Sequence, residues 1–292
     1  MNAYKLGSVD IAGARTPAVL RNGRVHPLRD VLGSDSPSRM IDLLQDWDRW
    51  SGRLRAASDP GGAGLDPAQL AYHAPVEEPR KLICIGINYR DHIAEMNSGP
   101  PPAMPYSFLR PPACLAGHRE TIRLPAQSQM VDWEAELGVV IGRRFRGGDP
   151  DAAMAAIAGY TIVNDLSARD WIAGRSPMVG IDWVVQKGWD GFQPTGPWIV
   201  PAEFVPDPQA LAIELTLNGA VKQKSNTGQM VFGVREIVRH LGMVMTLEPG
   251  DIIATGTPAG VGFGRKPPEF IRAGDKVSVS IAQLGTLENS FV

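Results

Sequence analysis

Short apolar stretches rich in β-branched residues, separated by glycine and proline, dominate the chain after residue 80. This pattern is typical of β-strands, because β-branched side chains pack well on a pleated surface. It predicts strands within 81–89, 131–142, 158–165, 210–219, 250–257 and 274–285. Apolar residues at helical spacing predict two helices, at 149–158 and 234–245. The main body of the protein is therefore expected to be β-rich, with few helices and long loops.

The first part of the chain has a different pattern. Alternating apolar and polar residues surround Asn22 and Gly23, a pair that tolerates positive φ in a two-residue hairpin turn. An apolar stripe then predicts a helix over 38–50, with Ser38 as its N-terminal cap.

A segment dense in glycine and proline follows at 58–67 and predicts a linker. We therefore expect a small N-terminal domain at 1–75 and a main domain at 76–292.

Composition and charge narrow the class of protein. Glycine and proline together make 57 of 292 residues, which favours a folded, loop-rich protein because 43% of residues are still hydrophobic. The net charge of −2 shows no basic surplus, so a nucleic-acid partner is not expected. No apolar run reaches membrane-spanning length, and the N-terminal residues lack the layout of a signal peptide. With only Cys84 and Cys114, a cytoplasmic protein that handles a small molecule is the expectation.

Carboxylates supply the first candidate site. Glu134 and Glu136 lie two residues apart in a predicted strand and should share one face, and Asp165 ends another predicted strand. Three carboxylates form an all-oxygen ligand set that suits Mg²⁺ or Mn²⁺. The alternative is that the two glutamates decorate a solvated strand face while Asp165 starts a turn, and spacing alone leaves both interpretations open.

A second candidate is the pair His92 and Glu95, three residues apart on a predicted helical turn. A carboxylate bonded to one imidazole nitrogen raises the basicity of the other, as a water-activating general base requires. The alternative, favoured by spacing alone, is a solvent-facing pair, and Asp91 offers a helix start.

Two further features are weaker. Lys187 is surrounded by aromatic residues and glycines and could stabilise an oxyanion, although a solvated surface lysine is the default. The glycine-rich run 255–262 follows a predicted strand and could bring backbone N–H groups to a ligand, or it could be a tight turn.

Taken together and in this order, the motifs resemble the fumarylacetoacetate hydrolase family. The blocks that carry the resemblance are CIGINYRDHIAE (84–95), DWEAELGVVIG (132–142), GYTIVNDLSARD (159–170), KGWDGFQPTGPW (187–198), LNGAVKQKSNT (217–227) and LEPGDIIATGTPAGVG (247–262). The resemblance covers the chain from about residue 81 onward. It implies an α+β, β-rich fold, a mixed β-sandwich roll with a small N-terminal α/β domain, and usually a homodimer.

The resemblance also implies residue roles. It assigns one divalent cation, Mg²⁺ or Mn²⁺, to Glu134, Glu136 and Asp165, and catalysis to His92, Glu95 and Lys187. Substrate contacts fall on Arg169, Gly256 and Thr257. Family members often carry lysine where Arg110 stands, and serine at 241–242; neither departure is expected to touch the chemistry.

The leading hypothesis is hydrolysis of a C–C bond in a 2,4-dioxo acid (an acylpyruvate or fumarylpyruvate-like substrate) through a metal-stabilised pyruvate enolate. The alternatives within the family are oxaloacetate decarboxylation and isomerase, tautomerase or dehydratase reactions of related 2-oxo acids. A non-catalytic binder is the remaining alternative, and the presence of every expected site residue argues against it.

Overall fold

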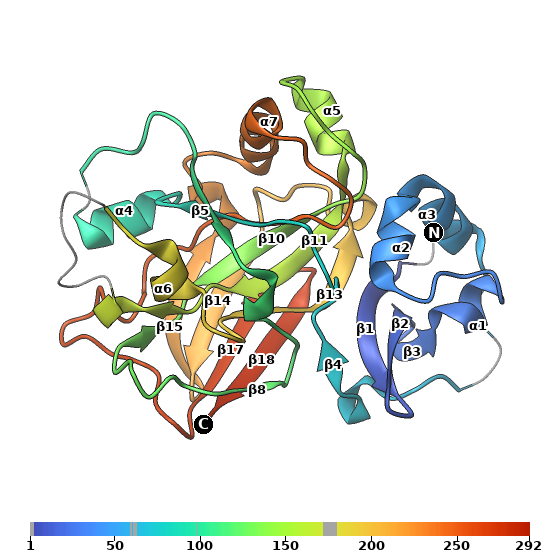
Figure 1. Cartoon of the computed structure of the whole chain (residues 1–292), viewed down its shortest axis with the longest axis horizontal. Helices are drawn as coiled ribbons and strands as arrows, with labels where there is room; N and C mark the ends of the chain where they lie inside the picture. The colour runs from blue at the N-terminus through green and yellow to red at the C-terminus, as the bar shows by residue number, and fades with distance from the viewer. Residues whose placement is uncertain (1–2, 59, 61–62, 98, 172–179) are drawn as a thin grey trace.

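The computed structural model describes residues 3–58, 60, 63–97, 99–171 and 180–292. Strands dominate these residues, and short helices lie around the edges of the sheets (Figure 1). In these ranges the α-helices are α1 (Leu28–Leu32), α2 (Met40–Gln45), α3 (Trp47–Ala56), α4 (Arg90–Met96), α5 (Pro150–Ala155), α6 (Trp183–Lys187) and α7 (Val234–Val244). None of them is long and apolar enough to cross a membrane. The predicted α+β, β-rich class is confirmed.

The larger sheet has eleven strands in the order β3-β2-β1-β13-β11-β10-β16-β5-β6, with β4 beside β1 and β7 beside β13. These strands are β1 (Lys5–Ile11), β2 (Ala14–Arg21), β3 (Arg24–Pro27), β4 (Tyr72–His73), β5 (Leu82–Gly86), β6 (Tyr106–Arg110), β7 (Leu115–Ala116), β10 (Ala135–Ile141), β11 (Ile157–Asn164), β13 (Gln193–Pro201) and β16 (Ile252–Ala254). Every residue of β10, β11 and β13 is buried, so the centre of this sheet is covered on both faces.

A second sheet covers one of those faces. Its five strands run in the order β15-β14-β17-β18-β8. They are β14 (Ala212–Leu217), β15 (Ala220–Asn226), β17 (Lys276–Ile281), β18 (Gly285–Phe291) and β8 (Thr121–Ile122). Strand β14 contacts β10, β17 contacts β11 and β18 contacts β13, so the two sheets stack around a shared hydrophobic core. A short pair, β9 (Val131–Asp132) with β12 (Ser167–Ala168), lies beside them.

The N-terminal hairpin is confirmed. Arg21 pairs with Arg24, and the two residues between them have the positive φ that the predicted turn needs, 51° for Asn22 and 75° for Gly23. The first strands join the larger sheet where Leu6 of β1 pairs with Ile199 of β13. The division into domains at 1–75 and 76–292 stays a prediction.

The helix predicted over 38–50 is two helices, α2 and α3, which meet at Asp46. Ser38 does not cap the first one, because α2 begins after Arg39. The carboxylate of Glu77 instead accepts from the backbone N–H groups of Met40 and Ile41, at 3.1 and 3.3 Å. A distant acid therefore takes the role that the sequence assigned to a local hydroxyl.

Each predicted strand region contains a strand, with one difference that matters for function. The region 131–142 divides into β9 and β10, and Trp133 and Glu134 lie between them. Of the predicted helices, 234–245 corresponds to α7, whereas 149–158 contains the shorter α5 and the beginning of β11. Helices α5 and α7 contact each other beyond one end of the sheets, away from α4 and α6 (Figure 1).

Candidate active site

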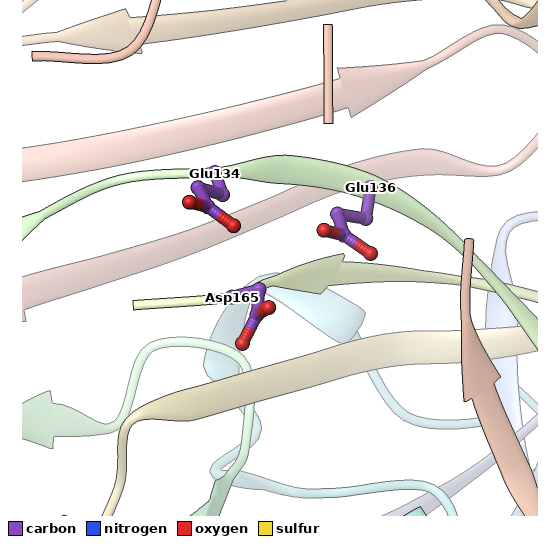
Figure 2. Close-up of side chains that lie close together, drawn as sticks. All are labelled: Glu134, Glu136 and Asp165. Carbon is purple, nitrogen blue, oxygen red and sulfur yellow. The ribbon is translucent and has the colours of Figure 1, made fainter. Parts of the chain in front are cut away.

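Three carboxylates meet at the end of two paired strands. Glu136 lies in β10, Glu134 directly precedes that strand, and Asp165 directly follows β11. Ala135 pairs with Asn164 across these strands, so their register brings the flanking acids together. One oxygen of each carboxylate lies within 4.8 Å of the other two (Figure 2).

The cluster is buried, which decides between the two interpretations of the acidic motif. Glu134, Glu136 and Asp165 are 7%, 1% and 1% exposed. The interpretation that the two glutamates decorate a solvated strand face is therefore wrong. A shared strand face is also not what brings the glutamates together, because Glu134 lies outside β10 and its backbone N–H donates to the side-chain oxygen of Asn164 at 3.1 Å.

Burial and mutual repulsion change how these acids ionise. Burial, and then the charges of Asp165 and Glu134, raise the pKa of Glu136 well above its usual value. Burial also acts to raise the pKa of Glu134, but the positive charges of Lys187 and Arg169 outweigh it and lower that pKa to about 2. The negative charge of Glu136 is therefore poorly compensated by the protein. A cation bound beside it would reduce its repulsion with Asp165 and Glu134.

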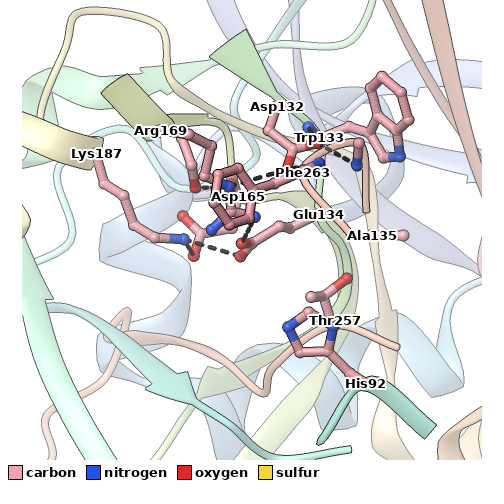
Figure 3. Close-up of polar contacts among 12 residues, drawn as sticks. His92, Asp132, Trp133, Glu134, Ala135, Asp165, Arg169, Lys187, Thr257 and Phe263 are labelled. Atoms are coloured by element: carbon pink, nitrogen blue, oxygen red, sulfur yellow. Dashed lines mark hydrogen bonds and ion pairs between the residues drawn. The ribbon is translucent and has the colours of Figure 1, made fainter. Parts of the chain in front are cut away.

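Lys187 and Arg169 are two of the cations that contact the cluster (Figure 3). Lys187, the last residue of α6, donates from Nζ to Glu134 at 2.8 Å and to Asp165 at 2.6 Å. Arg169 donates to Glu134 at 2.6 Å and to Asp132 at 2.9 Å. Burial acts to lower the pKa of Lys187, but Asp165 and Glu134 outweigh it and raise that pKa, so the ammonium is protonated. The interpretation of Lys187 as a solvated surface lysine is therefore wrong.

His92 and Glu95 are paired on α4, but the solvent-facing pair that spacing alone favoured is wrong, because the two side chains are only 15% and 18% exposed. Nδ1 of His92 lies 3.1 Å from Oε2 of Glu95, and both side chains are mostly buried. A carboxylate at this distance favours the tautomer with the proton on Nδ1, and in that neutral tautomer Nε2 is the proton acceptor. Asp91 does not start the helix, which begins after Tyr89.

The glycine-rich run is more than a tight turn, because its backbone N–H groups bind three acids of the site. The donors are Gly256 to Glu136 at 2.7 Å, Gly260 to Glu95 at 2.8 Å, and Gly262 and Phe263 to Asp132 at 2.6 and 3.1 Å. We call residues 256–263 the acid-binding loop. Gly256 has a φ of +97°, a conformation that favours glycine.

These groups surround a cavity of about 100 Å³. It is lined by Ile85, Gly86, Ile87, His92, Phe108, Glu134, Glu136, Asp165, Arg169, Trp183, Lys187 and Thr257. Seven of the nine predicted site residues are in this lining. The other two, Glu95 and Gly256, bind directly to lining residues. In Figure 3, Lys187 and Arg169 lie to one side of Glu134, and His92 and Thr257 to the other.

Two residues of this network were missed from the sequence. Arg110 is buried at the end of β6 and donates to Asp165 and to the carbonyl oxygens of Lys187 and Phe192. The expectation that this position does not touch the chemistry is therefore wrong. A signal was available, because an arginine that ends a mostly apolar strand needs a buried partner.

The other missed residue is Asp132, which is fully buried between Arg169 and the acid-binding loop. The sequence contained a signal for Asp132 in the spacing of the acids. Asp132 lies two residues before Glu134, just as Glu134 lies two residues before Glu136.

The residues present fit a divalent cation. The donors are carboxylate oxygens, the set that Mg²⁺ and Mn²⁺ prefer over zinc. Two of the three carboxylates already share one internal cation, the ammonium of Lys187, while the carboxylate of Glu136 accepts from the backbone N–H of Gly256. The cluster is therefore suited to a divalent metal ion.

Comparisons with known proteins identify a family and several similar chains. The family model described as "Fumarylacetoacetate (FAA) hydrolase C-terminal" matches residues 81–292. An oxaloacetate tautomerase of Bos taurus, named as mitochondrial, is 42% identical over 256 residues, which are 88% of this chain and 80% of the relative.

Solved structures of similar chains carry different activities in their names. A fumarylacetoacetate hydrolase from Exiguobacterium antarcticum has a TM-score of 0.82 at 32% identity, covering 99% of both chains. A 2-hydroxyhepta-2,4-diene-1,7-dioate isomerase from Mycobacterium marinum has a TM-score of 0.72 at 32% identity, covering 99% of this chain and 98% of the other. A maleylpyruvate hydrolase from Sphingobium sp. SYK-6, in complex with manganese(II) ion and pyruvate, has a TM-score of 0.80 at 30% identity, with the same coverage.

These relatives have in common a fold and a family, whereas their names divide between hydrolysis, isomerisation and tautomerisation. The resemblance drawn from the sequence motifs is confirmed. With a family match over more than half of its length, this chain belongs to the fumarylacetoacetate hydrolase family of enzymes.

Proposed function

We propose that this chain is a metal-dependent enzyme that forms the enolate of a 2-oxo acid, and that it hydrolyses a C–C bond in a 2,4-dioxo acid. The observation that carries the proposal is the position of His92. Its Nδ1 is bound to Glu95, and its ring lines the same small cavity as the three carboxylates. A proton acceptor and the carboxylate cluster therefore face the same cavity.

In this proposal Glu134, Glu136 and Asp165 hold one Mg²⁺ or Mn²⁺ ion. When bound, such an ion binds substrate oxygens and offsets the negative charge of an enolate. The protein groups around it have their own tasks: Lys187 and Arg169 keep Glu134 ionised, and the N–H of Gly256 orients Glu136.

His92 is the proposed base. Nε2 takes a proton from water as the oxygen attacks C4 of the dioxo acid, and the C3–C4 bond then breaks. The C4 side leaves as a carboxylic acid, and the electron pair remains as the enolate of pyruvate. The imidazolium returns its proton to C3, which gives pyruvate and restores the base. Glu95 stabilises the imidazolium through Nδ1.

Lys187 is proposed to offset the charge that develops on the enolate oxygen, because its protonated Nζ lies at the carboxylate cluster. Thr257 and Arg169 line the cavity and are proposed substrate contacts. Gly256 is proposed to act through Glu136, since its N–H is already bound there.

A second candidate reaction is keto–enol tautomerisation of oxaloacetate. It is favoured by the name of the relative that is 42% identical. The same His92 would then move a proton directly between C3 and the enol oxygen, without an attacking water. Decarboxylation of oxaloacetate likewise needs no attacking water and would depend less on the His92–Glu95 pair.

The test is to incubate the Mg²⁺-loaded protein with 2,4-dioxopentanoate and with enol-enriched oxaloacetate, following enol absorbance, pyruvate and acetate. Hydrolysis yields pyruvate and acetate in equal amounts, tautomerisation changes the enol absorbance without pyruvate, and decarboxylation yields pyruvate and CO₂. His92→Asn should lower hydrolysis by about 10²–10⁴-fold while Mg²⁺ still binds.

The matched control is His240→Asn on α7, outside the cavity lining. Full hydrolytic activity in His92→Asn contradicts the water-activating role. No change of either substrate, with metal bound, leaves a non-catalytic binder as the function.

Two further expectations stay proposals. We propose a homodimer, to be tested by light scattering of the purified chain. We also propose a cytoplasmic location, although the name of the bovine relative places that protein in mitochondria; fractionation of the source cells decides between them.

A further inference from the structure

The cavity that holds the carboxylate cluster also has an apolar wall. Ile85, Ile87, Phe108 and Trp183 are part of its lining. The rings of Phe108 and Trp183 are stacked, with centroids 4.1 Å apart and planes 8° from parallel. The indole N–H of Trp183 donates to the hydroxyl of Tyr106 at 3.0 Å, so the polar atom of this pair is already satisfied.

A second hollow adjoins this stacked pair, and apolar side chains form part of its lining. This hollow of about 480 Å³ shares Phe108 and Trp183 with the first and is also lined by Gly180, Asp182 and three apolar residues, Leu109, Ile181 and Val184. These three side chains are 54%, 45% and 61% exposed. Clustered exposed apolar side chains of this kind mark a binding surface more often than isolated ones do.

Ile87 is held at the cavity in an unfavourable backbone conformation. Its φ is +56°, which a β-branched residue rarely adopts, and its side chain is 44% exposed. The next residue, Asn88, keeps the backbone there through hydrogen bonds to Phe232 and Thr255. Strain of this kind persists where the surrounding structure imposes it and is frequent at ligand sites.

The charged groups of the cavity already have partners. Lys187 is bound to Glu134 and Asp165, Arg169 is bound to Glu134 and Asp132, and His92 is bound to Glu95. Among the described lining residues, then, no basic side chain is left without an acid. A second carboxylate on the substrate would therefore lie against apolar side chains without a dedicated counter-charge, and would lose part of its hydration there.

We infer that the end of the substrate remote from its 2-oxo acid group is uncharged and apolar, an alkyl or aryl acyl group received by Ile87, Phe108 and Trp183. The inference rests on the proposed function, because it takes the 2-oxo acid end to bind at the carboxylate cluster. It separates this chain from enzymes that act on dicarboxylic acids such as oxaloacetate.

Binding of matched acids tests the inference without turnover. 2-Oxohexanoate and 2-oxohexanedioate have the same chain length and differ in a terminal methyl or carboxylate, and 2-oxo-4-phenylbutanoate adds an aromatic ring. Titration calorimetry of the Mg²⁺-loaded protein should show the monoacid binding at least about 10-fold more tightly than the diacid, since one apolar group in a fitted pocket is worth about 10–200-fold. The phenyl compound should bind at least as tightly as 2-oxohexanoate.

Variants at Ile87 make the test specific. Ile87→Lys adds one charge beside the apolar wall and should shift the monoacid-to-diacid ratio by about 10-fold or more toward the diacid, whereas the matched neutral change Ile87→Gln weakens the monoacid without improving the diacid. Val244→Lys places the same charge on exposed α7, outside both hollows, and should leave the ratio unchanged. Thermal denaturation checks that each variant is folded.

The outcomes separate this inference from the proposed function. Wild-type protein that binds the diacid as tightly as the monoacid, or an Ile87→Lys variant with an unchanged ratio, overturns the apolar subsite even if 2,4-dioxo acids are cleaved. A preference for the monoacid in a protein that turns over no 2-oxo acid supports the subsite and overturns the catalytic proposal.

Discussion

The backbone N–H of Gly260 donates a 2.8 Å hydrogen bond to Oε1 of Glu95. The other oxygen of this carboxylate accepts from Nδ1 of His92 at 3.1 Å. Both oxygens are therefore engaged, so the acid cannot turn away from the imidazole. The acid-binding loop thus fixes the ring that we propose as the base, although loop and helix are far apart in the chain.

This arrangement predicts a large effect for Glu95→Gln. The amide has one acceptor oxygen, which cannot serve both Gly260 and the Nδ1–H of His92. The imidazole is then driven to the tautomer with its proton on Nε2, and the base is lost. We expect turnover to fall by about 10²–10⁴-fold with little change in Mg²⁺ affinity, measured by steady-state kinetics and calorimetry. A variant with wild-type turnover contradicts the orienting role.

Metal removal should stop the reaction reversibly. We expect chelation to abolish turnover and added Mg²⁺ or Mn²⁺ to restore it. Glu136→Gln keeps an oxygen that can accept from Gly256 but removes one negative charge from the ligand set. It should weaken Mg²⁺ binding at least about 10-fold, since ligand charge sets cation affinity, and should reduce the rise in melting temperature that Mg²⁺ causes. Equal affinity in both proteins would show that Glu136 is not a ligand.

Arg110 should matter for the fold as well as for the site. Arg110→Met leaves Asp165 with one cation fewer and two buried carbonyl oxygens without their donor. Breaking a buried ion pair costs about 3–5 kcal/mol, so urea denaturation should show a loss of this size. Arg110→Lys retains the charge and should keep turnover within about 10-fold of wild type while losing part of the stability. Equal losses of stability and turnover in Arg110→Met and Arg110→Lys would show that the positive charge at this position is not responsible for either effect.

Gly256→Ala should damage the site beyond its effect on the backbone. An added Cβ would lie 2.9 Å from Cβ of Asn88 and 3.1 Å from the carbonyl oxygen of Ile85, at a φ of +97°. Relief of that clash shifts the N–H that binds Glu136, so metal affinity and turnover should both fall.

Gly219→Ala is the control for that variant. Gly219 also has a positive φ, +80°, but an added Cβ would meet nothing within 4 Å. It should cost only the conformational term of about 1–2 kcal/mol in unfolding free energy, with turnover unchanged. Similar turnover in the two variants would argue against a special role for Gly256.

His118 predicts how stability depends on pH away from the site. Burial, and then the charge of Arg119, lower its pKa to about 4, and Nδ1 accepts from the backbone N–H of Glu288. Between about pH 6.5 and 4 the unfolded chain binds the proton more readily than the folded protein does. The contribution of His118 is therefore complete above about pH 6.5 and is lost as pH falls through 4, by up to roughly 3 kcal/mol.

The check is chemical denaturation of the wild type and of His118→Asn across this range. Asparagine keeps an acceptor for Glu288 but does not titrate, so the variant should lose less stability on acidification. The same pH dependence in both proteins assigns the effect to other groups.

Local features were predictable because they depend on neighbours in the chain. The Asn22–Gly23 turn, helix α7 and the contact between His92 and Glu95 follow from spacing within a few residues. Errors arose where a distant group replaced a local one. Glu77 caps α2 instead of Ser38. Residue spacing along the chain does not predict a capping carboxylate that comes from another element.

The sequence by itself determined which chemical groups are present: three acids able to bind a cation, a histidine with its acid, and the family to which they belong. Only the tertiary structure decided what these groups contact. The pairing of Ala135 with Asn164 joins Glu134 and Glu136 to Asp165, and packing of β6 brings Arg110 to the same acid. Strand register and the demand that buried charges be paired act between residues far apart in the chain, so their result appears only when the sheets are assembled.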